Sequence, residues 1–144
     1  LSIRRQRQMC IRDRDYSAVT AACLMTKKAL FDEVGGFTEK LAVAFNDIDY
    51  CMKVRASNHL VVYNPYALLY HYESKSRGLE DTPEKVARFN REWALVAKRW
   101  PDILQNGDPY YNPNLTLRKS DFSLRDLLKE KIGEPYKLPE IKEQ

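Results

Sequence analysis

The sequence has 144 residues, enough for one domain and short for two, and its 9 Tyr, 5 Phe and 2 Trp exclude a chain that is disordered throughout. No apolar run approaches the roughly 20 residues that a membrane-spanning helix requires. The formal net charge of +4 comes entirely from residues 1–14, where five arginines face one acid, Asp13, so the remaining chain is neutral and does not favour nucleic-acid binding.

Residues 1–14 lack the apolar stretch and the small-residue cleavage site of a secretory signal. They resemble a translated sequencing adapter, so we expect a non-native leader and a natural sequence that begins near Asp15 and is truncated there. An Arg-rich arm that binds an anionic partner is the alternative interpretation of this segment.

The chain has three cysteines, Cys10, Cys23 and Cys51, which are widely spaced and form no pattern typical of a metal site. This usage fits a reducing compartment and argues against a disulfide scaffold. We expect Cys23 and Cys51 to be inert thiols in the core. With no membrane-spanning run, the cysteine usage predicts a cytoplasmic protein, attached at most peripherally to the inner face of the membrane.

The first predicted elements are a strand and a helix. Residues 16–25 are a run of small apolar residues, which predicts a buried strand. Thr26 is expected to cap a helix over residues 27–34. Gly35 and Gly36 should end this helix, because glycine adopts the left-handed conformation at little cost.

A second helix is predicted to begin at Asn46 and to end at Asn58, since asparagine tolerates the left-handed cap position. Its largely apolar face recurs at helical spacing through Ile48, Cys51, Met52 and Arg55. Two short strands are expected after it, over residues 60–63 and 67–72, with Pro65 as the break between them.

The longest predicted helix begins at Thr82-Pro83, with threonine as the N-cap and proline at the first helical position. Its apolar stripe consists of Val86, Phe89, Trp93, Val96, Ala97 and Trp100. Pro101 is expected to end this helix. Ser123 is expected to cap a last short helix over residues 124–132.

The string Asn46-Asp47-Ile48-Asp49 stands at the start of the second helix. One interpretation is structural, with Asn46 as the N-cap and both acids at the positive end of the helix. The other is a carboxylate that acts as a general base at the edge of a site, because a helix N-terminus favours the ionised form. The two interpretations are compatible, since a capping carboxylate can still face a cleft.

A second group of candidate residues stands at the end of the strand predicted over residues 67–72 and in the polar loop after it. His71 can bind a divalent ion through a neutral ring nitrogen. Ser76, Arg77 and Gly78 form a polar loop in which the guanidinium can hold a phosphate and the hydroxyl and backbone amides add donors. A hydrogen-bonded histidine beside a solvated loop is the alternative, because a single histidine is a poor metal site.

These segments together resemble the acceptor-side, C-terminal half of a family 2 glycosyltransferase of the GT-A fold. The strings that carry the resemblance are Thr20-Ala-Ala-Cys-Leu-Met, Phe31-Asp-Glu-Val-Gly-Gly-Phe37, Asn46-Asp-Ile-Asp-Tyr-Cys, Asn64-Pro-Tyr-Ala67, His71-Tyr-Glu-Ser and Ser76-Arg-Gly78. The sequence is similar to enzymes that build bacterial surface polysaccharides, including rhamnosyltransferase-like members. The resemblance implies an α/β fold, the later part of a mixed sheet flanked by helices, over residues 15–117. Residues 118–144 would form a helical or frayed extension.

The resemblance also implies roles for individual residues. Asp47 matches the catalytic carboxylate that deprotonates the acceptor hydroxyl of an inverting transfer from a nucleotide sugar to a saccharide. His71 matches a position that completes the metal site or contacts the diphosphate, and residues 76–78 match a loop that closes over the diphosphate. Asp49 matches a position that supports the helix start or the acceptor pocket. The intact enzyme would use Mn²⁺ or Mg²⁺.

Two features depart from the family pattern. Asn46 stands where the family usually has Glu, and the nucleotide-binding half with its Asp-x-Asp metal motif is not in this sequence. We therefore expect a fragment that binds neither nucleotide sugar nor metal well by itself. The alternative function is a non-catalytic module that binds carbohydrate or protein through the surface of Tyr110 and Tyr111, with the long helix predicted from Thr82 as a docking element.

Overall fold

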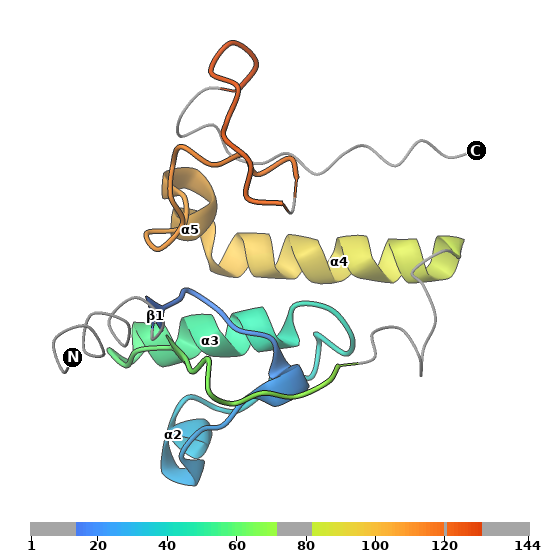
Figure 1. Ribbon diagram of the computed structural model, residues 1–144. Helices are drawn as coiled ribbons and strands as arrows, with labels where there is room; N and C mark the ends of the chain where they lie inside the picture. The colour runs from blue at the N-terminus through green and yellow to red at the C-terminus, as the bar shows by residue number, and fades with distance from the viewer. Residues whose placement is uncertain (1–13, 72–81, 120, 131–144) are drawn as a thin grey trace, which may run out of the picture. The chain divides into compact units, whose positions relative to one another are not determined.

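The computed structural model describes residues 14–71, 82–119 and 121–130 (Figure 1). The chain divides into two compact units, Leu1–Lys98 and Arg99–Gln144. The elements, in chain order, are β1 (Arg14–Asp15), the 3₁₀ helix η1 (Ala21–Cys23), α2 (Lys28–Glu33), α3 (Asn46–Ala56), β2 (Val62–Tyr63), α4 (Pro83–Arg99) and α5 (Pro101–Asn106).

The sheet formed by the described residues has two short antiparallel strands, β1 and β2. Arg14 pairs with Tyr63 and Asp15 with Val62, so the strand predicted over residues 60–63 is confirmed in its second half. The strand predicted over residues 67–72 is wrong for 67–71, which are irregular and exposed; residue 72 lies outside the described ranges.

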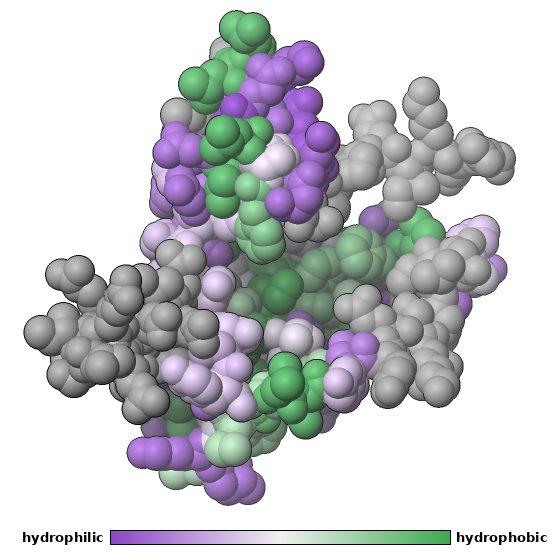
Figure 2. Space-filling view, in the orientation of Figure 1, coloured by the Kyte–Doolittle hydropathy of each residue, from purple (hydrophilic) through white to green (hydrophobic). Residues whose placement is uncertain are grey.

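The chain around and after β2 exposes a run of large apolar side chains. Its members are Leu60, Val62, Tyr63, Tyr66, Leu68, Leu69 and Tyr70, of which Leu68 is 84% and Tyr70 88% exposed. Figure 2 shows hydrophobic side chains gathered on the visible face where this segment crosses it. We call residues 60–70 the apolar strip; a stretch with both faces apolar is typical of a strand covered on both sides.

The strand predicted over residues 16–25 is wrong. The segment is irregular up to η1, whose N-cap Thr20 accepts a hydrogen bond from the backbone N–H of Ala22 at 3.3 Å. The backbone N–H of Tyr16 donates to the backbone oxygen of Val61 at 2.9 Å, and the residues after it pack on α3, where Ser17 accepts a 2.7 Å hydrogen bond from Nη1 of Arg55. Ser17 is buried, whereas Met25 is 98% exposed, so a run of small apolar residues does not by itself establish a buried strand.

The helix predicted over residues 27–34 is confirmed as α2, but its cap is not. Lys27 occupies the N-cap position and makes no side-chain capping bond. The hydroxyl of Thr26 instead accepts a 2.9 Å hydrogen bond from the hydroxyl of Tyr50 on α3. Thr26 therefore joins α2 to the core, because a hydroxyl can satisfy a buried phenol as readily as a helix start.

Gly35 and Gly36 end α2 in the left-handed conformation, as predicted, with φ of +77° and +56°. A Cβ on Gly36 would lie 2.7 Å from Cε1 of Phe31, whereas one on Gly35 would meet nothing within 4 Å. We expect Gly36→Ala to lower the free energy of unfolding by about 3 kcal/mol and Gly35→Ala by about 1 kcal/mol. Urea denaturation of the two variants measures the difference, and equal losses would contradict the close approach.

The core of the first unit is built on α3. Its buried members Tyr50, Cys51 and Val54 cluster with Val61. Partly buried side chains pack against this cluster: Ala18, Val19, Leu24, Leu30, Phe31 and Val34. The end of α3 matches the prediction, because Asn58 adopts the left-handed conformation with φ of +63°.

The predicted start of the longest helix is confirmed in α4, where Oγ1 of Thr82 accepts a hydrogen bond from the backbone N–H of Lys85 at 3.4 Å. The helix ends before Pro101, also as predicted. Pro101 then opens α5 at the first helical position, where its missing N–H costs nothing. Within the ranges that the structure describes, no helix is long and apolar enough to cross a membrane.

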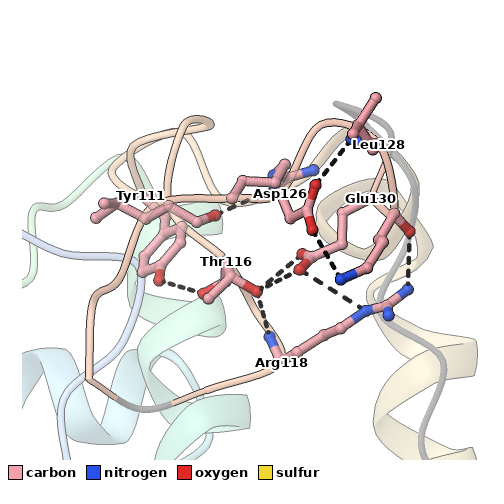
Figure 3. A network of polar contacts seen from close by, with 9 residues as sticks. Tyr111, Thr116, Arg118, Asp126, Leu128 and Glu130 are labelled. Atoms are coloured by element: carbon pink, nitrogen blue, oxygen red, sulfur yellow. Dashed lines mark hydrogen bonds and ion pairs between the residues drawn. The ribbon is translucent and has the colours of Figure 1, made fainter.

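The second unit is organised around the buried side chain of Thr116 (Figure 3). Its hydroxyl lies 2.8 Å from both carboxylate oxygens of Glu130 and accepts a 3.0 Å hydrogen bond from the backbone N–H of Arg118. The hydroxyl of Tyr111 donates to the backbone oxygen of Thr116 at 3.0 Å. These bonds hold an irregular segment together through side chains.

The helix predicted over residues 124–132 is wrong for the described residues 124–130. Leu124 forms an antiparallel bridge with Leu115, and Asp126 closes a turn by accepting a 3.0 Å hydrogen bond from the backbone N–H of Leu128. An aspartate that bonds nearby backbone in this way competes with helix formation. The serine expected to cap the helix, Ser123, instead accepts a 2.9 Å bond from Thr116 through its backbone oxygen.

Candidate functional site

The first turn of α3 carries two acids, Asp47 and Asp49. Asp47 is half-buried, and its Oδ2 accepts a hydrogen bond from the backbone N–H of Ala21 at 3.1 Å. Its Oδ1 accepts from the backbone N–H of Ile48 at 2.9 Å. Asp47 thus joins the start of α3 to η1, while each carboxylate oxygen keeps a lone pair for a further donor.

Asp49 lies on the buried side of the same turn, with 0% of its surface exposed. Oγ1 of Thr38 donates to its carboxylate at 2.6 Å, and Nζ of Lys53 lies 3.5 Å from it. Lys53 also donates to the backbone oxygen of Gly36 at 2.9 Å. Of the two roles expected for Asp49, these contacts match support of the helix start; the side chain presents no surface to an acceptor.

The residue before α3 is a non-glycine residue in the left-handed conformation. Phe45 occupies the N-cap position with φ of +62° and makes no side-chain capping bond, so the expectation that Asn46 caps the helix is wrong. The conformation costs about 1–2 kcal/mol and persists only where surrounding contacts fix it. Such residues cluster at functional sites.

The contacts that fix Phe45 come from α4. The ring centroid of Phe45 lies 4.8 Å from that of Phe89 and 5.6 Å from that of Trp93. The backbone N–H of Ala44 donates a 2.6 Å hydrogen bond to Oε2 of Glu92, a buried carboxylate. The loop that leads into α3 is therefore attached to α4 by two aromatic contacts and one charged hydrogen bond, next to Asp47.

The buried thiol of Cys51 lies on the same helix as Asp47. Burial raises the pKa of the Cys51 thiol above its ordinary value, and the negative charge of Asp47 raises this pKa further. Cys51 is buried and neutral, as predicted, and its Sγ lies 3.8 Å from the backbone oxygen of Val19. The same expectation is wrong for Cys23, which is exposed on η1 because the segment forms no strand.

The second group of predicted residues is only partly described. His71 is exposed and ends the first described range, and Ser76, Arg77 and Gly78 lie outside the described residues. Among residues 14–71, 82–119 and 121–130, no three His, Cys, Asp or Glu side chains form a group that could hold a metal ion. The described part of the chain therefore does not provide a metal site by itself.

The tyrosine pair of the alternative function is divided between two environments. Tyr111 is half-buried, its hydroxyl donates to Thr116, and its ring centroid lies 6.5 Å from that of Phe122. Tyr110 is 41% exposed. Tyr111 thus serves the packing of the second unit, which does not favour a stacking surface made of both rings.

Glu92 is the residue of this site that sequence reasoning missed. It lies 48 positions after its partner Ala44, so no local pattern connects the two. One signal was present: Glu92 follows Phe89 by three residues and precedes Val96 by four, which puts a carboxylate inside the apolar stripe of α4. A charge on the buried face of an amphipathic helix indicates a specific partner.

Comparison with known proteins gives relatives but no family model and no solved structure that matches. The chain is 56% identical over 112 residues to the uncharacterized protein y4gI of Sinorhizobium fredii, covering 77% of this chain and 12% of that protein. It is 36% identical over 112 residues to the O-antigen biosynthesis protein RfbC of Myxococcus xanthus, covering 78% of this chain and 8% of that protein.

A third relative is the N-acetylglucosaminyl-diphospho-decaprenol L-rhamnosyltransferase of Mycobacterium tuberculosis, 25% identical over 95 residues, which are 66% of this chain and 31% of that protein. The chain thus spans less than a third of the length of each of these relatives. It is similar to segments of longer proteins, one of them named for O-antigen biosynthesis and another named as a sugar transferase.

Proposed function

We propose that this chain supplies the acceptor-side part of a family 2 glycosyltransferase with the GT-A fold. The enzyme transfers a sugar from a nucleotide-sugar donor to a saccharide acceptor, with inversion, in the synthesis of a bacterial surface polysaccharide. The observation that carries the proposal is Asp47, a half-buried carboxylate at the start of α3 with acceptor capacity to spare. The similarity to RfbC and to a rhamnosyltransferase supports the reaction class.

In this proposal Asp47 is the general base. Its two oxygens accept one backbone N–H each, which orients the carboxylate and leaves lone pairs that can accept the proton of an acceptor hydroxyl. The deprotonated oxygen forms a bond to the anomeric carbon while the bond from that carbon to the diphosphate oxygen breaks. Attack opposite the leaving nucleoside diphosphate inverts the anomeric configuration, and the proton stays on Asp47.

The proposal retains Mn²⁺ or Mg²⁺ as the cofactor of the intact enzyme, with His71 as one ligand or as a contact to the diphosphate. Residues 76–78 would close over the same diphosphate, where Arg77 balances the charge of the leaving group.

A transfer assay on the natural polypeptide that carries this sequence tests the proposal. The probes are nucleoside-diphosphate sugars, L-rhamnose included, with N-acetylglucosaminyl-diphospho-decaprenol as the acceptor, the compound in the mycobacterial relative's name. We expect release of nucleoside diphosphate and, by NMR, a product of inverted anomeric configuration. Retention of configuration, or no transfer from any donor in the set, would contradict the proposal.

A further inference from the structure

We infer that Glu92 is a positioning residue for Asp47 and acts through the backbone of residues 44–46, an inference that rests on the function proposed for Asp47. Glu92 is 4% exposed, and its Oε2 accepts the backbone N–H of Ala44 at 2.6 Å. Ala44 precedes the catalytic candidate by three residues. The carboxylate of one helix thus fixes the chain at the point where it enters the other helix.

A carboxylate is not needed at this position for packing. Position 92 lies on the apolar stripe of α4, where an apolar side chain would fill the same space without the cost of burying a charge. The only other charged contact of Glu92 within the described residues is Nε of Arg88, 4.0 Å from Oε1 and at the limit of an ion pair. The short bond to Ala44 is therefore the main interaction that the buried carboxylate makes.

That bond acts on a strained part of the chain. The residue after Ala44 is Phe45, whose left-handed backbone would relax to a more common conformation if its constraints were lost. The rings of Phe89 and Trp93 hold its side chain, and Glu92 holds the peptide before it. Three residues on one face of α4 thus hold Phe45 in the conformation that starts α3.

The orientation of Asp47 follows from this arrangement. The backbone oxygen of Phe45 accepts the N–H of Asp49 at 2.9 Å, the first helical bond of α3. If Phe45 relaxes, this first turn opens and the bond from Ala21 to Asp47 is strained. A displacement of about 1 Å in a reacting group can reduce the rate about 10²-fold, even when substrate binding is unchanged.

The test compares Glu92→Met, which keeps the volume and removes the acceptor, with Glu92→Gln, which keeps an acceptor oxygen. In the natural polypeptide, below its unfolding temperature, we expect Glu92→Met to lower kcat about 10²-fold with the acceptor KM within about twofold, and Glu92→Gln to recover most of the loss. Hydrogen exchange at the Ala44 amide should be faster in Glu92→Met and near normal in Glu92→Gln. Glu84→Met, an exposed change on the same helix, is the matched control.

The outcomes separate this inference from the proposed function. If Glu92→Met keeps a normal kcat while Asp47→Asn does not transfer, Glu92 is not a positioning residue and the proposed function stands. If Asp47→Asn transfers normally, both fail. Should Glu92→Met not fold, the variant that combines Glu92→Met with Phe45→Gly decides, because glycine adopts the left-handed backbone without the constraint from Glu92. A kcat equal to that of Phe45→Gly alone supports the inference, and a kcat about 10²-fold lower overturns it.

Discussion

Replacement of Asp47 by Asn is expected to reduce sugar transfer by the natural polypeptide about 10²–10⁴-fold, the usual contribution of a general base. An amide cannot take the proton of the acceptor hydroxyl. It keeps one carbonyl oxygen that can accept from the backbone N–H of Ala21, so the start of α3 should persist. The measurements are kcat from the release of nucleoside diphosphate and the donor Kd from calorimetry, which should change less than about twofold.

Asp32→Asn is the matched control for the Asp47 substitution. Asp32 is an exposed carboxylate on α2 that pairs with Lys28, remote in sequence from the start of α3, so its loss should leave kcat unchanged. A near-normal rate in Asp47→Asn would show that Asp47 has only its structural role, as the residue that joins α3 to η1. A loss of donor binding equal to the loss of rate would assign Asp47 to the donor site and not to the chemistry.

Replacement of Asp49 by Ala is expected to lower the free energy of unfolding by about 3 kcal/mol. The change removes the acceptor of the Thr38 hydroxyl and leaves Lys53, whose side chain is 18% exposed, without the carboxylate beside it. Urea denaturation with linear extrapolation measures the loss. Asp49→Asn, which keeps an acceptor for Thr38, should lose about half as much.

A double-mutant cycle with Thr38→Val makes the Asp49 prediction specific. The two substitutions remove the two ends of one 2.6 Å hydrogen bond, so their effects should be less than additive by about 1–2 kcal/mol. Asp32→Ala removes an exposed carboxylate and should change stability by less than about 0.5 kcal/mol. If Asp49→Ala unfolds like the wild type, the buried contacts do not stabilise α3. If Asp49→Ala instead loses sugar transfer while its stability is unchanged, Asp49 contributes to the acceptor pocket.

The sequence predicted those elements whose signals are local. The start of α4 depends on Thr82 and Pro83, and the end of α2 depends on two glycines with positive φ. The end of α3 follows from Asn58, but the apolar face predicted for this helix is only partly right, because Ile48 is exposed and Tyr50 and Val54 are buried. In each case the residues that determine the boundary lie within a few positions of it, so the pattern contains the physical cause.

The predictions failed where the partner of a segment lies elsewhere in the chain. Residues 16–25 have the composition of a buried strand, but they pack on α3 through contacts such as that of Ser17 with Arg55. Residues 124–130 follow a serine and contain apolar residues suited to a helix, but Leu124 pairs with Leu115. A single sequence cannot choose between such alternatives, because tertiary contacts decide which backbone partners are used.

In the candidate site, too, the features with local signals could be predicted and those that depend on distant residues could not. Asp47 could be found because it stands at a recognisable helix start, and the structure adds its two backbone donors. The left-handed Phe45 could not be predicted, since an aromatic residue is rare in that conformation and α4 holds it there. The role of Asp49 was left open between two alternatives, and its complete burial is a property of the folded core.

The apolar strip affects the tendency of the protein to self-associate. Leucine and tyrosine side chains that are exposed over residues 60–70 lie beside backbone groups that can pair with another chain. A molecule with this stretch uncovered is prone to self-association as its concentration rises, and it is a ready substrate for chaperones and proteases. We therefore expect substitutions of polar residues for exposed leucines in this stretch to reduce self-association.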